Sequence, residues 1–94
     1  MDDVKVYMVV NLDIEDKDTY LKYEKGFFPI LKKHGGEFVT FDDSVRHLEG
    51  PEPLPGGRVI IFSFPSEAAA DAWYSDPEYQ ELSKFRREGA PLRS

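Results

Sequence analysis

Few side chains in this sequence have types and spacings that could do chemistry. Tyr20 and Tyr23 lie three residues apart in a segment with helical periodicity, so both hydroxyls are expected on one helix face. A tyrosine hydroxyl placed there could donate a hydrogen bond to a developing oxyanion. Inward-facing tyrosines more often contribute buried aromatic surface with a satisfied hydroxyl, so both roles stay open.

His34 stands directly before Gly35-Gly36, where the same helix should end. An imidazole at this position could act as a general base near neutral pH. It could equally be a cationic side chain that opposes the negative end of the helix dipole. His34, Tyr20 and Tyr23 are the candidates for catalytic residues.

Four further residues are candidates for ligand binding. Asn11, near the end of the first expected strand, could bind a carbonyl group or cap a turn. Arg58 opens the third expected strand, where it could bind a substrate carboxylate or form a cross-strand ion pair with Glu49. Phe27 and Trp73 offer aromatic surface, which packs into the core in most proteins.

Two weaker signals lie elsewhere in the chain. His47 and Glu49 share one face of an extended segment, as a small acid/base pair would, although many solvated edge positions do the same. Arg86 on the last helix is expected on a solvated face or reaching back toward a cleft.

The two histidines lack metal-binding spacing, and the sequence has no cysteine, glycine-rich nucleotide motif or nucleophile elbow. We therefore expect neither a metal nor a cofactor.

Composition narrows the class of protein. The 94 residues are enough for one domain, 1–94, and 40% hydrophobic content is enough for a core. Because the net charge is −6 and the basic residues are scattered, nucleic-acid binding is not expected. No apolar stretch approaches the roughly 20 residues that span a bilayer. The acidic start Met1-Asp2-Asp3 does not resemble a signal peptide, so a soluble cytoplasmic protein is expected.

These side chains must be positioned by alternating strands and helices. A helix is expected from a cap at Asp16 or Asp18 to Gly35, bent at Pro29, and two more begin at Ser66 and at Asp76-Pro77. Strands are expected at 4–12, at 37–41 and at 58–64. The second of these is expected to continue through 45–49 after a bulge or turn at 42–44. A stiff loop is expected at 50–57, and at most a stub of a fourth strand near the C-terminus. The order predicts an α+β fold, βαββα(β), with helices on one face of an antiparallel sheet.

The expected strands are apolar on both faces. In the first strand, alternation places Val4, Val6, Met8 and Val10 on one face and Tyr7 and Val9 on the other. In the third strand it separates Val59 and Ile61 from Ile60, Phe62 and Phe64. In the second strand it separates Phe38 and Thr40 from Val39 and Phe41. Two short helical segments can cover only one face, and the other would leave a large exposed apolar patch. We therefore expect a homodimer that packs sheet face against sheet face.

With these residues placed, the chain resembles the DUF1330 family of the dimeric α+β barrel, or ferredoxin-like, superfamily. The matching residues cover nearly the whole chain: Tyr20, Tyr23, Pro29, Gly35-Gly36, Leu48-Glu49-Gly50, Arg58, Phe64-Pro65-Ser66, Ala72-Trp73-Tyr74, Pro77, Tyr79 and Arg86. Such proteins usually continue into a last apolar strand, which this sequence lacks. The family has no assigned activity, and its wider superfamily includes cofactor-free monooxygenases, isomerases, dehydratases and haem enzymes.

The residues and the resemblance together predict a homodimer with a small apolar cleft in each subunit for a small cyclic or aromatic compound, which could carry a carboxylate. Such a protein would be either a cofactor-independent enzyme, with proton-transfer or oxygenase-type chemistry, or a non-catalytic ligand-binding or structural dimer. An open cavity lined by Tyr20, Tyr23 or His34 would favour a ligand site. An interior filled by Phe27, Phe28 and Trp73 would favour the structural module.

Overall fold

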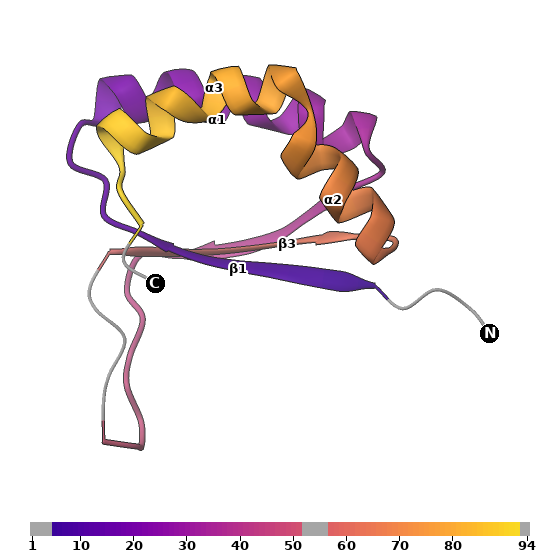
Figure 1. The fold of residues 1–94 in the computed structure, drawn as a ribbon. Helices are drawn as coiled ribbons and strands as arrows, with labels where there is room; N and C mark the ends of the chain where they lie inside the picture. The colour runs from indigo at the N-terminus through magenta and orange to yellow at the C-terminus, as the bar shows by residue number, and fades with distance from the viewer. Residues whose placement is uncertain (1–4, 52–56, 93–94) are drawn as a thin grey trace.

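The computed structural model describes residues 5–51 and 57–92, and shows an α+β fold in which helices cover one face of an antiparallel sheet (Figure 1). The elements within these residues are β1 (Val6–Leu12), α1 (Lys17–Lys33), β2 (Glu37–Asp42), β3 (Arg58–Phe64), α2 (Glu67–Ser75) and α3 (Pro77–Gly89). This confirms the predicted fold class. The predicted strand start at Val4 and the centre of the predicted loop, residues 52–56, lie outside the described residues.

The sheet has the strand order β1-β3-β2, with both pairs antiparallel. Beyond the three strands, Leu92 forms a single antiparallel bridge with Leu12. The backbone N–H of Asp13 also donates to the carbonyl of Pro91 at 3.0 Å. The expected stub of a fourth strand is thus one bridge at the end of β1.

A bulge in β2 changes which side chains share a face. Phe38 lies opposite Phe62 and Phe41 lies opposite Ile60, because the register shifts between Phe38 and Thr40. Simple alternation, which separated Phe38 from Phe41, is therefore wrong for this strand. The extra residue, Val39, brings both phenyl groups to the face that the helices cover.

The prediction that the second strand continues through 45–49 is also wrong. The backbone N–H of Ser44 donates to the side chain of Asp42 at 2.7 Å, which forms a local turn at the end of β2. From there to Pro51 no described residue pairs with the sheet. The segment leaves the sheet on the side opposite the helices (Figure 1), and Leu48 within it is 79% exposed.

Helix α1 begins and ends where local signals predicted. The carboxylate of Asp16 accepts from the backbone N–H groups of Asp18 and Thr19, at 3.1 and 3.2 Å. Gly35, at φ 74°, adopts the left-handed conformation just past the helix end. The helix continues through Pro29, and its buried face carries Tyr20, Tyr23, Phe27, Ile30 and Leu31.

Helices α2 and α3 meet at the predicted corner. Ser66 caps α2 by accepting from the N–H of Ala69 at 3.2 Å, and Asp76 caps α3 by accepting from the N–H of Glu78 at 2.9 Å. The last turn of α3 lies directly on the first turn of α1. The backbone N–H groups of Glu15 and Asp16 both donate to the carbonyl of Gly89, at 2.8 and 2.9 Å.

The sheet face away from the helices is open and apolar. Tyr7 and Val9 are 57% and 64% exposed. Val59 and Ile61, which lie beside them in the neighbouring strand, are half-buried. In the described part of the chain, no helix has the length and apolar character that crossing a membrane requires.

Candidate functional site

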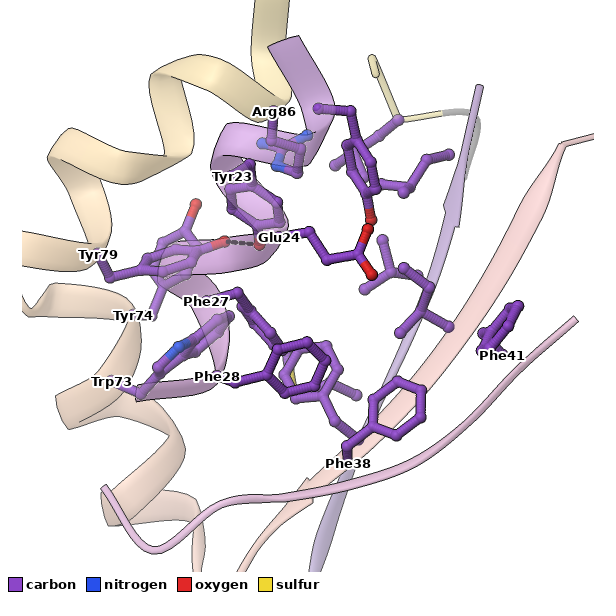
Figure 2. Close-up of a pocket in the computed structure, with 17 residues that line it drawn as sticks. Tyr23, Glu24, Phe27, Phe28, Phe38, Phe41, Trp73, Tyr74, Tyr79 and Arg86 are labelled. Atoms are coloured by element: carbon purple, nitrogen blue, oxygen red, sulfur yellow. Dashed lines mark hydrogen bonds between the residues drawn. The ribbon is translucent and has the colours of Figure 1, made fainter. Parts of the chain in front are cut away.

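A pocket of about 280 Å³ lies between the helices and the covered face of the sheet. Its walls come from every element and are mainly apolar, as in most small-molecule sites. Figure 2 shows the pocket with the aromatic rings of several elements around it. The lining residues are Met8, Val10, Leu12, Tyr20, Tyr23, Glu24, Phe27, Phe28, Phe38, Phe41, Ile60, Phe62, Trp73, Tyr74, Tyr79, Arg86 and Leu92.

The aromatic wall results from local spacing and sheet register together. Helical periodicity places Tyr20, Glu24, Phe27 and Phe28 on the side of α1 that faces the sheet. The β2 bulge supplies Phe38, whose ring lies edge-on to that of Phe28 with centroids 5.7 Å apart. This interior is lined by aromatic rings and still leaves an open cavity.

Tyr20 and Tyr23 both line the pocket, but their hydroxyls have different surroundings. Burial raises the pKa of the Tyr20 hydroxyl to about 12, Glu24 adds to the rise, and Arg58 and Arg86 oppose it. The Tyr20 hydroxyl is therefore protonated at neutral pH. The Tyr23 hydroxyl lies 3.1 Å from that of Tyr79 in a buried hydrogen bond, and burial raises its pKa further. Tyr23 thus has a structural partner of its own.

Arg58 lies beside the pocket with its charge already compensated. Its Nε and Nη2 donate to the two carboxylate oxygens of Asp43, at 2.7 and 3.1 Å. Its Nη1 is 4.0 Å from the carboxylate of Glu24, and its guanidinium lies over the ring of Phe41. An ion pair with Glu49, the alternative considered from sequence, is not formed; the turn after β2 brings Asp43 there instead.

Arg86 is the second cation at the pocket, and its environment differs. The side chain is half-buried and lines the cavity. Across residues 5–51 and 57–92, its guanidinium makes no ion pair or side-chain hydrogen bond. Figure 2 places Arg86 beside Tyr23 at one side of the pocket, away from Phe28 and Phe38.

His34 does not reach the pocket. Its Nε2 lies 2.7 Å from the carboxylate of Asp76, and Lys33 Nζ lies 3.0 Å from the same group. These contacts join the end of α1 to the first turn of α3. The hydrogen bond from His34, with those from Lys33 and the N–H of Glu78, holds the pKa of Asp76 well below its usual range. The structure therefore separates His34 from Tyr20 and Tyr23.

Asn11 also lies away from the pocket. It belongs to the open face of the sheet, and its Nδ2 donates to the carbonyl of Arg58 at 3.2 Å across the β1–β3 pair. Its Oδ1 is buried with no hydrogen-bond partner in the described part of the chain, and so is the Nε1 of Trp73. Of the four predicted ligand-binding residues, Phe27 and Trp73 line the pocket, Arg58 borders it, and Asn11 does not contribute to it.

The remaining signals do not converge on a site. His47 Nε2 hydrogen-bonds the carbonyl of Gly50 at 2.8 Å in an exposed turn. Among the residues that the structure describes, no three His, Asp or Glu side chains are grouped as metal ligands would be.

Sequence reasoning missed Glu24, whose carboxylate group lines the pocket. The available signal was its spacing, because Glu24 lies four residues after Tyr20 and four before Phe28. A charged residue within an inward-facing aromatic stripe indicates a polar group in a cavity. Phe38 and Phe41 could not be found in this way, because their shared face depends on the bulge.

The sequence matches the model of a family described as a domain of unknown function, DUF1330, over residues 5–94. The fold is similar to a crystal structure of the methylated RPA0582 protein, with 24% identity, a TM-score of 0.74, and coverage of 95% of this chain and 75% of that chain. It is also similar to a structure of the RPA0582 protein of unknown function from Rhodopseudomonas palustris, with 26% identity, a TM-score of 0.71, and coverage of 96% and 75%. Curated proteins give no match. The chain therefore belongs to the DUF1330 family.

Proposed function

We propose that this protein binds a small cyclic or aromatic molecule in the pocket between the helices and the sheet. The observation that carries the proposal is the open cavity of about 280 Å³ inside a shell of aromatic side chains. A structural module would use such rings to fill its own core, since protein interiors rarely leave voids larger than a water molecule. The few polar groups at one side of the cavity would orient a ligand.

The test is calorimetric titration with small aromatic and cyclic compounds, starting with 1-naphthoate and 1-naphthamide. The Val10→Phe variant places a larger side chain in the cavity and should abolish binding while the fold is retained. The matched control is Leu21→Phe, which adds the same ring at an exposed position of α1. No binding to wild-type protein, or equal binding by wild type and Val10→Phe, would favour the structural-module alternative.

We also propose that the protein is a homodimer whose subunits meet through the open sheet face. Exposed Tyr7 and Val9 support this proposal, because monomers seldom expose a contiguous apolar patch on a sheet. The segment that ends at Pro51 extends from the sheet on this same side, where it could contact a second copy (Figure 1). The strand order, with Leu92 bridged to β1, supports the ferredoxin-like arrangement expected for such dimers.

The dimer is tested by light scattering coupled to size-exclusion chromatography at micromolar concentration. Val9→Lys should convert the dimer to a monomer, because a buried unpaired charge at the centre of an apolar interface is strongly unfavourable. Leu21→Lys, the same change at an exposed position on the helical side, should leave the dimer intact. A monodisperse wild-type monomer would refute the homodimer.

A second candidate is cofactor-independent proton-transfer catalysis at the same pocket, and Glu24 is the observation that favours it. Its carboxylate lines an apolar cavity that Tyr20 also lines, so a base and a hydroxyl donor face one space. Tyr20 would then be a catalytic residue, and Glu24 would take the place first considered for His34. Deuterium incorporation from D₂O into a bound compound, lost in Glu24→Gln, would support this candidate. Binding without exchange would leave a ligand-binding protein.

A further inference from the structure

Arg86 differs from the other charged groups around the pocket because it forms no ion pair or side-chain hydrogen bond with the residues that the structure describes. Glu24 faces Arg58 at 4.0 Å, and Arg58 is held by both carboxylate oxygens of Asp43. The guanidinium of Arg86 has no such contact within the described residues, although the side chain is half-buried and lines the cavity. Buried polar groups are usually satisfied by protein, water or ligand, so a half-buried guanidinium that the described residues leave unpaired has donors available for an anionic ligand.

The backbone holds Arg86 in this position. The carbonyl of Gly89 accepts from the N–H groups of Glu15 and Asp16, which fixes the last turn of α3 on the first turn of α1. A Cβ at Gly89 would lie 2.9 Å from the backbone nitrogen of Tyr20, so the two helices are in close contact there. Arg86 is therefore carried on a docked helix end beside Tyr20, and not on a free surface turn.

We propose that the pocket selects an aromatic carboxylate, whose ring lies among the aromatic side chains and whose carboxylate is bound by the guanidinium of Arg86. This inference rests on the proposed ligand-binding function and adds the chemical class of the ligand. Arginine suits the role because its planar fork of N–H groups matches the two oxygens of a carboxylate. Tyr20 lines the same pocket, and its protonated hydroxyl is a further donor.

Arg58, the arginine first considered for this role, is less suited to it. Two of its N–H donors are already used by Asp43, and the carboxylates of Asp43 and Glu24 offset its positive charge. Glu24 also has a directing effect, because its negative charge repels a carboxylate from the middle of the pocket. The acidic group of the ligand is therefore directed to Arg86, and its apolar ring to the side of Phe28 and Phe38, which lie away from Arg86 in Figure 2.

The test compares 1-naphthoate with its neutral analogue 1-naphthamide by calorimetry. Wild-type protein should bind the carboxylate at least about tenfold more tightly, as expected for hydrogen bonds to a charged group. Arg86→Gln should remove most of this preference and change the affinity for 1-naphthamide by no more than about twofold. Arg87→Gln, the same change at the neighbouring exposed arginine, should keep the preference. Arg86→Lys, which retains the charge without the fork, should keep part of it.

Glu24→Gln gives an independent test of how the pocket orients a carboxylate. Removing the negative charge should strengthen binding of 1-naphthoate and leave 1-naphthamide almost unchanged; weaker binding of 1-naphthoate would contradict the directing role. Equal wild-type affinity for the two probes, or an undiminished preference in Arg86→Gln, would overturn the carboxylate proposal and leave the aromatic pocket standing. Binding of neither probe by wild type would count against the proposed function itself, and the inference would fall with it. Thermal unfolding of each variant excludes loss of fold as the cause.

Discussion

The hydroxyls of Tyr23 and Tyr79 lie 3.1 Å apart in the interior and link α1 to α3. Their rings meet nearly edge-on, with centroids 6.3 Å apart. Tyr23 and Tyr20 therefore have different roles although they share one helix face. Tyr23 belongs to the interface between the two helices, whereas Tyr20 remains a candidate for contact with a ligand.

Tyr23→Phe should lower the free energy of unfolding by about 1 kcal/mol, because it leaves the buried Tyr79 hydroxyl without a partner. The double variant Tyr23→Phe/Tyr79→Phe should lose less free energy of unfolding than the two single variants lose together. Urea denaturation measures all three variants. Strict additivity would mean that the hydroxyl pair contributes nothing to stability.

Tyr20→Phe is the matched change at the pocket, and its effect should appear in binding. We expect several-fold weaker affinity for 1-naphthoate and a smaller change for 1-naphthamide, because only the carboxylate accepts a strong hydrogen bond from the lost hydroxyl. Calorimetry with both probes measures the difference. Unchanged affinity for 1-naphthoate would remove Tyr20 from the binding site.

Gly89→Ala should destabilise the protein by about 1–3 kcal/mol, because overpacking there forces backbone to move. The new methyl group would lie 2.9 Å from the nitrogen of Tyr20 and 3.0 Å from the carbonyl oxygen of Asp16. Gly26→Ala is the control, since the three atoms nearest to its methyl group all belong to the side chain of Leu82 and none to the backbone. Urea denaturation should show the larger loss for Gly89→Ala, and the reverse order would contradict the close docking of α3 on α1.

Asp76 should make the fold sensitive to acid. Its pKa is lowered in the folded protein, so its charge stabilises the fold at pH values above the unfolded pKa of about 4. This contribution is lost as the pH falls from there toward the lower folded value. Asp76→Asn keeps a capping side chain without the charge, so the variant should be less stable than wild type at pH 7. The difference should shrink toward pH 2. A difference in stability between wild type and Asp76→Asn that does not change with pH would refute this role of the carboxylate.

Trp73→Ala should be among the most destabilising single changes and should lower the free energy of unfolding by about 3–5 kcal/mol. Trp73 is 3% exposed and its ring contacts those of Phe62, Phe64 and Tyr79, with centroids 4.2–5.4 Å apart. Tyr74→Ala is the neighbouring control, because Tyr74 is 61% exposed. Thermal or urea unfolding distinguishes the two variants. A similar small loss in both would mean that Trp73 is not part of the core.

Much of the fold was predictable from sequence because its signals are local. The caps at Asp16, Ser66 and Asp76 were read from side chains that bond to backbone groups two or three residues away. The α+β class followed from the order of strands and helices. The expected membership of DUF1330 was confirmed over residues 5–94. The homodimer, the ligand and the cytoplasmic location stay predictions.

The sequence by itself determined the helix ends, the central residues of the three strands and the aromatic character of the interior, because each depends on neighbours along the chain. Only the tertiary structure decided which charged groups meet. Arg58 pairs with Asp43, His34 with Asp76 at 42 residues' separation, and Arg86 with no described side chain. These outcomes depend on the β2 bulge and on the docking of α3 against α1. A shift of one residue in a strand moves its side chains to the other face, and local periodicity carries no information about that shift.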